Sequence, residues 1–116
     1  MAFKFEELKV WQISLKVSNE IDLIAKSFPR IELFSLTNQI KKAADSLNLN
    51  IAEGCISQSK AEFSRFLTYS VRSGLEVVSC LFMASSRKYI SDLEFKRLYL
   101  EYETLCKMIP KLKSSL

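Results

Sequence analysis

Residues 59–88 read SKAEFSRFLTYSVRSGLEVVSCLFMASSRK, and this stretch decides the fold. It opens with Ser59 and Glu62, the capping-box pair that begins many helices. An apolar stripe follows in alternating steps of three and four residues: Phe63, Leu67, Ser70, Gly74, Val77, Leu81 and Ala84. A second apolar row lies beside it: Val71, Leu75, Val78 and Phe82. The stretch therefore predicts one long helix that is covered on two sides.

Two further stretches, both N-terminal to this helix, repeat apolar residues at the same period. The first covers about residues 6–27 and stops at Phe28-Pro29, because the residue before a proline avoids the helical region. The second covers about residues 33–53. Gly54 then sits where a C-terminal cap glycine belongs, so we expect it to end this helix.

The last stretch opens with a second capping box, Ser91 and Glu94, and continues to Leu112. Pro110 falls inside it, so we expect a kink or a frayed last turn. The connections between the four stretches are short, and short connections make neighbouring helices antiparallel. The expected fold class is all-α: one domain over residues 1–116, an up-down-up-down antiparallel four-helix bundle.

The apolar coverage is wider than a monomeric bundle needs. In residues 6–27 and 59–88, the first and third helical stretches in chain order, it extends over more than one side of the helix, whereas an outer helix has one narrower apolar face. Contiguous exposed apolar surface marks interfaces. We therefore expect a closed homo-oligomer. A monomer with scattered exposed apolar residues is the alternative.

The composition argues against several kinds of function. There is no histidine, the commonest general base and metal ligand, so a Ser-His-Asp triad is impossible within this chain. The three cysteines form no CxxC pair, which argues against a zinc site. We expect no catalytic residue, no metal, no cofactor and no enzymatic activity.

The sequence shows neither a signal-peptide pattern nor a membrane-spanning one. The N-terminus has no apolar signal-peptide run, and the longest uncharged stretch, residues 77–86, is too short to span a bilayer. A cytoplasmic location without a membrane partner is the expectation.

Polar residues flank the apolar stripe of the second stretch, where AADSLNLNIAEG occupies residues 43–54. At about 100° per residue they fall on one line, and the third stretch carries a matching line. The members of this polar seam are Gln39, Ser46, Asn50, Glu53, Ser73 and Glu76. Polar groups beside a core need partners and, once satisfied, fix register. We interpret the seam as structural, between helices or between subunits, and we expect Asn48, which lies off the line, to be exposed.

The formal net charge is +4, and residues 59–90 carry five basic and two acidic side chains, a surplus of 5 − 2 = +3. Lys41 and Lys42 lie away from the stripe of their helix. Arg65 and Arg72, seven residues apart, share an outward face of theirs. Exposed cations of this kind contact phosphates. These four residues are our candidates for nucleic-acid contact, and a solvated surface is the alternative.

The chain resembles a known family in motifs spread over nearly its whole length. They are LKVWQ (residues 8–12), Phe28-Pro29 with Glu32, Lys41-Lys42-Ala43-Ala44, NIAEG (residues 50–54), Ser59 with Glu62-Phe63, and Ser73 with Glu76. In these motifs it is similar to the four helix bundle protein family, also called 23S rRNA intervening-sequence proteins.

The resemblance implies a four-helix bundle that assembles as a homopentamer and has no enzymatic activity. Genes of the family lie inside intervening sequences of the large ribosomal RNA in some bacteria. A related accessory protein of diversity-generating retroelements is a basic pentamer that works with a reverse transcriptase and nucleic acid. By this analogy the expected partners are copies of the chain itself, RNA or DNA, and a reverse transcriptase. The family usually has arginine at Ser57 and glycine at Arg72, so the basic surface is rearranged here.

The leading hypothesis is a non-enzymatic homo-oligomer, expected to be a pentamer, that binds nucleic acid or a nucleic-acid enzyme through basic outer faces. The alternative is a protein-interaction scaffold or adaptor with no nucleic-acid role. Binding that weakens steeply with salt distinguishes the first hypothesis. A protein partner that survives nuclease treatment distinguishes the second.

Overall fold

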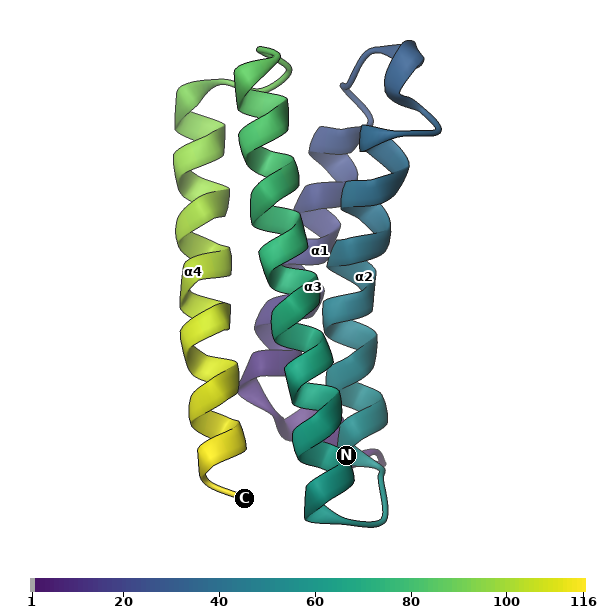
Figure 1. Cartoon of the computed structure of the whole chain (residues 1–116), viewed down its shortest axis with the longest axis vertical. Coiled ribbons are helices and arrows are strands. Elements are labelled where there is room, and N and C mark those ends of the chain that lie inside the picture. Colours follow the sequence, from purple (N-terminus) through teal and green to yellow (C-terminus); the bar gives the residue numbers. More distant parts are fainter. Residues whose placement is uncertain (1) are drawn as a thin grey trace.

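The computed structural model describes residues 2–116, and over this range it contains helices and no strand (Figure 1). In chain order the helices are η1 (Lys4–Glu7), α1 (Lys9–Ala25), η2 (Arg30–Glu32), α2 (Leu36–Cys55), α3 (Lys60–Ser86) and α4 (Asp92–Ser114), where η marks a short 3-10 helix. The four α-helices run alternately up and down, and both chain ends lie at one end of a rod of 43 × 24 × 23 Å. The predicted all-α fold with four long helices is confirmed.

One core runs along this rod. α2 packs most extensively against α3, and α4 packs mainly on α3, whereas α1 and α4 meet only sparsely. Every α-helix contributes fully buried side chains, for example Ile21, Leu47, Leu81 and Leu105. Each such side chain stabilises the fold by roughly 1.5–3 kcal/mol. Because α2 contacts α1 and α3, and α3 contacts α2 and α4, these two helices together form the centre of the packing.

The stripe predicted for α3 faces this core. Its small members allow close approach of the neighbouring helices: the Ser70 hydroxyl donates to the backbone carbonyl of Leu47 at 2.9 Å. A methyl group added to Gly74 would lie 2.8 Å from the Cys106 sulfur and 3.0 Å from Leu47 Cδ1. α2 and α4 therefore approach α3 at a level where it carries almost no side-chain bulk.

The helix ends differ from the predictions in several places. α1 begins at Lys9 and not near residue 6, because the chain first forms η1 and then passes through an extended residue, Leu8. α2 begins at Leu36 and not at residue 33, because η2 and a turn occupy the preceding residues. α4 continues through Pro110 to Ser114.

Gly54 does not cap a helix. It lies inside α2, it is buried, and its φ is not positive, whereas Lys88 after α3 adopts φ 62°. A methyl group at this position would lie 2.7 Å from Phe66 Cβ and 2.9 Å from Phe63 Cδ1. The predicted cap is wrong: the glycine is needed because α3 passes too close for any side chain.

Candidate functional site

Three members of the predicted polar seam come together between α2 and α3. The Asn50 amide donates to the backbone carbonyl of Ser46 at 2.8 Å and to its hydroxyl at 3.0 Å. The Ser73 hydroxyl, from α3, donates to the Ser46 hydroxyl at 3.0 Å. All three side chains are half-buried. This part of the seam lies within one chain and contributes to the register of α2 against α3.

The other members of the seam lie apart from this cluster. Glu53 is exposed at the end of α2. Gln39 and Glu76, both exposed, line a polar cleft of about 320 Å³ nearer to the start of α2, together with Lys42. The line of polar residues is thus divided into an internal hydrogen-bonded part and an open part.

The sequence pattern predicts that Asn48 is exposed, and this prediction is wrong. Its side chain is 9% accessible, and its amide donates to the Ser14 hydroxyl at 2.9 Å and to the Trp11 carbonyl at 3.4 Å. This buried link ties α2 to α1. The pattern within α2 could not indicate this link, because Ser14 lies on another helix, 34 positions away, and its hydroxyl also donates to the Trp11 carbonyl of its own helix.

The four candidate basic residues do not form one site. Lys41 forms an ion pair with Asp22 of α1 at 3.3 Å. The hydrogen bonds from Lys41 and then Lys26 lower the pKa of the Asp22 carboxyl. Lys41 thus has a partner within the fold, which sets it apart from the other three candidates.

Lys42, Arg65 and Arg72 are exposed, and within the described part of the chain no acidic side chain lies within ion-pair distance of them. Arg65 and Arg72 are separated by two turns on the outer face of α3, and Lys42 lines the polar cleft beside Glu76. These three residues keep their charges available to a ligand.

A buried carboxylate joins the two connections at the upper end of the bundle in Figure 1. Glu32 of η2 accepts hydrogen bonds from the Ser35 hydroxyl at 2.7 Å and from Tyr89 at 2.8 Å, and it pairs with Arg87 at 2.9 Å. The Ser35 bond first and the Tyr89 bond second lower the pKa of Glu32 to about 2. The periodic pattern does not indicate this network, since its members lie in or beside the helix connections.

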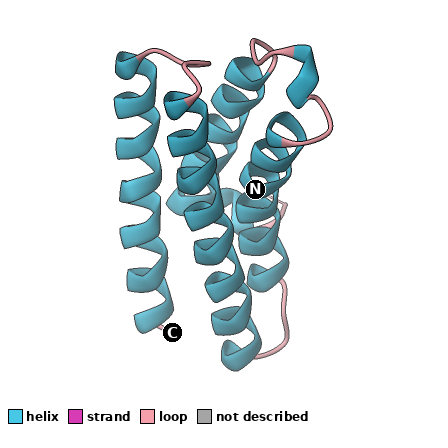
Figure 2. Ribbon diagram, turned by 45° about the horizontal axis from the view of Figure 1, so that its top comes forward, coloured by secondary structure: helices cyan, strands magenta, loops and turns pink. Residues whose placement is uncertain are grey.

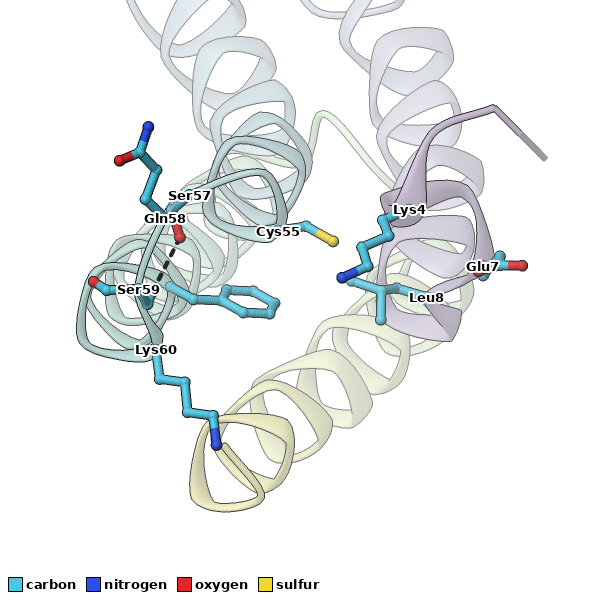
Figure 3. Close-up of a pocket in the computed structure, with 9 residues that line it drawn as sticks. Lys4, Glu7, Leu8, Cys55, Ser57, Gln58, Ser59 and Lys60 are labelled. Carbon is cyan, nitrogen blue, oxygen red and sulfur yellow. Dashed lines mark hydrogen bonds between the residues drawn. The ribbon is translucent and has the colours of Figure 1, made fainter.

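A cleft of about 470 Å³ lies at the opposite end of the bundle, between η1 and the α2–α3 connection. Figure 3 shows Lys4 and Cys55 reaching toward each other across it beside Leu8, while Glu7 and Gln58 point away. Burial raises the pKa of the Cys55 thiol. The side chains that point inward therefore provide an apolar wall, a protonated thiol and one ammonium group.

The described residues include no candidate metal centre and no candidate membrane span. Over residues 2–116, no cluster of three or more cysteine, aspartate or glutamate side chains is placed to hold a metal ion. Over the same range, none of the helices combines the length and the apolar character that crossing a lipid bilayer requires.

Comparisons with known proteins agree on the fold. A family model described as 23S rRNA-intervening sequence protein matches residues 6–111. A crystal structure of a Bacteroides thetaiotaomicron protein of unknown function, from the S23 ribosomal protein family, superposes with a TM-score of 0.84 at 21% sequence identity. The match covers 90% of this chain and 97% of that one. No curated protein matches the sequence.

Proposed function

We propose a function for this chain, which belongs to the 23S rRNA-intervening sequence protein family. It is a non-enzymatic helical bundle that binds nucleic acid, and RNA in particular. The observation that carries the proposal is the pair Arg65 and Arg72 on the outer face of α3, which no acidic side chain in the described range neutralises. Lys42 adds a third available charge on α2. We place the protein in the cytoplasm, with no metal or cofactor.

Phosphate binding follows from the chemistry of these side chains. Each arginine presents a planar, permanently charged fork that matches a phosphate. Binding releases counterions, so the logarithm of the affinity falls in proportion to the number of phosphates neutralised as salt rises. Lys41 contributes less than its neighbour, because its ion pair with Asp22 must be broken or shared.

The experiment measures RNA binding at several salt concentrations for the wild type and for the double variant Arg65→Gln, Arg72→Gln. We expect the slope of log affinity against log salt to fall by about two, one for each phosphate that the variant no longer neutralises. The matched control is Lys9→Gln, Lys16→Gln, because these lysines are also exposed and seven residues apart, on α1. If both double variants behave alike, or if the wild type binds no RNA at low salt, the proposal is wrong.

We also propose that copies of the chain associate, as a pentamer by resemblance to the family, through the face shared by α3 and α4. Leu75 and Phe82 are 58% and 54% exposed there, and Phe82 packs edge-on against Phe95 and Tyr99 at 4.9 and 6.0 Å between ring centroids. Such contiguous apolar surface is costly to leave in water. The proposal predicts a native mass of several subunits for the wild type.

Substitution of this face tests the assembly. Leu75→Ser with Phe82→Ser is expected to reduce the native mass. Leu23→Ser, at a 66% exposed position on α1, is expected to leave it unchanged. A wild type that is monomeric at micromolar concentration would contradict the assembly.

The second candidate function is a protein-interaction scaffold or adaptor, and the same apolar face favours it if a different protein covers that face. A partner such as a reverse transcriptase, captured after nuclease treatment and lost with Phe82→Ser, would support the scaffold. RNA binding that depends on Arg65 and Arg72 supports the nucleic-acid role instead.

A further inference from the structure

One aromatic side chain of the described chain is almost entirely in solvent. Phe34, in the connection between α1 and α2, is 91% exposed, and Ile31, three residues earlier in the same connection, is 87% exposed. Every other aromatic residue in this range is more buried than Phe34. The connection projects at one end of the bundle (Figures 1 and 2). An aromatic ring in this position has a free face on which a ligand can stack.

The backbone that carries Phe34 is held firmly. Glu32, two residues earlier, is fixed by Arg87 and Tyr89 from the other connection at this end. Ser35, the next residue, donates its hydroxyl to the same carboxylate. A ring on a fixed backbone loses less conformational freedom when it binds than a ring on a loose loop does. The exposure of Phe34 is therefore a property of a constrained segment.

The polar cleft beside Phe34 supplies a set of hydrogen-bonding groups. It holds about 320 Å³ and is lined by Phe34, Ser35, Asn38, Gln39, Lys42 and Glu76. Phe34 is its one apolar residue. Asn38 and Gln39 each offer an amide donor and an amide acceptor, Glu76 is an acceptor, and Lys42 is a cation without an acidic partner in the described range.

This combination fits a nucleotide better than a peptide. A hydrophobic anchor from another protein needs apolar side chains on several sides, whereas Phe34 is the one apolar residue among those that line this cleft. An unpaired base needs one aromatic face to stack on and polar groups for its edge. The phosphate of the same nucleotide needs a nearby cation, which Lys42 supplies.

We propose that the cleft between the start of α2 and α3 binds one unpaired nucleotide of a single-stranded RNA, with its base stacked on Phe34 and its phosphate at Lys42. The amides of Asn38 and Gln39 hydrogen-bond the edge of the base, and Glu76 accepts from an N–H group of that edge or from the ribose hydroxyl. This inference rests on the proposed nucleic-acid role. It adds a preference for unpaired strands, which the charges of Arg65 and Arg72 alone do not create.

The experiment compares Phe34→Ala with Leu93→Ala. Leu93 is 79% exposed at the first turn of α4, so its removal also takes one exposed apolar side chain away without disturbing the core. Both proteins are titrated at low salt with a ten-nucleotide uridine homopolymer and with an RNA duplex of ten base pairs. Circular dichroism checks that both variants are folded.

We expect Phe34→Ala to weaken binding of the single strand on the order of 5- to 150-fold, the range that corresponds to one base–aromatic stack. Duplex binding is expected to stay unchanged, because paired bases are already stacked on one another. Leu93→Ala is expected to bind both RNAs as the wild type does. In a Phe34→Trp variant, the added fluorescence is expected to be quenched by the single strand and not by the duplex.

The outcomes separate this inference from the proposed function. If the wild type binds RNA but Phe34→Ala binds the single strand equally well, the stacking site is wrong and the phosphate-binding role stands. If the wild type binds neither RNA at low salt, both are wrong. If Phe34→Ala changes the native mass and not RNA binding, Phe34 belongs to a contact between proteins and the inference is overturned.

Discussion

Replacing Gly54 by alanine tests, through the sign of the effect on stability, whether close packing outweighs helix propensity at this glycine. In a helix interior, alanine is favoured over glycine by roughly 1 kcal/mol. At Gly54 the new methyl would lie 2.7 Å from Phe66 Cβ, an atom that moves only with the backbone of α3. Overpacking of this kind costs about 1–3 kcal/mol, and a clash with a backbone-fixed atom belongs in the upper half of that range. We expect a net loss of about 1–2 kcal/mol.

Urea unfolding followed by circular dichroism measures this loss directly. For a chain of 116 residues, it corresponds to a fall in the melting temperature of roughly 3–12 °C. Gly54→Asn adds a second criterion, because asparagine is tolerated at a left-handed cap but is larger than alanine. We expect Gly54→Asn to be the less stable of the two variants. An alanine variant as stable as the wild type would refute the packing argument.

Two further predictions concern buried polar groups. Asn48→Ala removes the buried link to Ser14 and should lower the free energy of unfolding by about 1–3 kcal/mol. Asn50→Ala should lower it by less than about 1 kcal/mol, because the Asn50 amide bonds only its own helix. Urea titration of both variants measures the difference, and equal losses would contradict the inference that Asn48 links two helices. The pKa of Glu32 is lowered from its ordinary value of 4.5 to about 2, so its contribution to stability is present above pH 4.5 and is lost as the pH falls toward 2. In Glu32→Gln the melting temperature should vary less with pH across this window, and an unchanged profile would contradict the network.

The long helices could be predicted because their signals are local. The capping box at Ser91 and the stripe of α3 depend on residues three and four positions apart, and both are found as expected. Gly54 shows where local signals fail. A cap glycine and a packing glycine both stand at the end of an apolar stripe, and only the path of Phe63 and Phe66 on the next helix distinguishes them.

The candidate site was less predictable for the same reason. Lys41 and Lys42 are adjacent and identical in the sequence, yet Asp22 of α1 neutralises the first and not the second. Whether a cation is available to a ligand depends on a neighbouring helix, which a pattern within one helix cannot contain. The same holds for Asn48, whose partner, Ser14, is 34 positions away.

The polar and apolar residues that break the pattern of this bundle have opposite roles. Asn48 and Ser70 are polar residues at the core and Ser46 is a half-buried one beside it, and each makes a hydrogen bond to another helix, so each contributes to the fixed position of one helix against another. Phe34 and Leu75 are apolar residues in water, 91% and 58% exposed among the residues that the structure describes. A group that is hydrogen-bonded inside the fold has less to offer a partner than one that is uncovered. Substitutions of the exposed apolar residues and of the unpaired arginines should therefore change binding first, whereas substitutions in the internal polar links should change stability before they change binding.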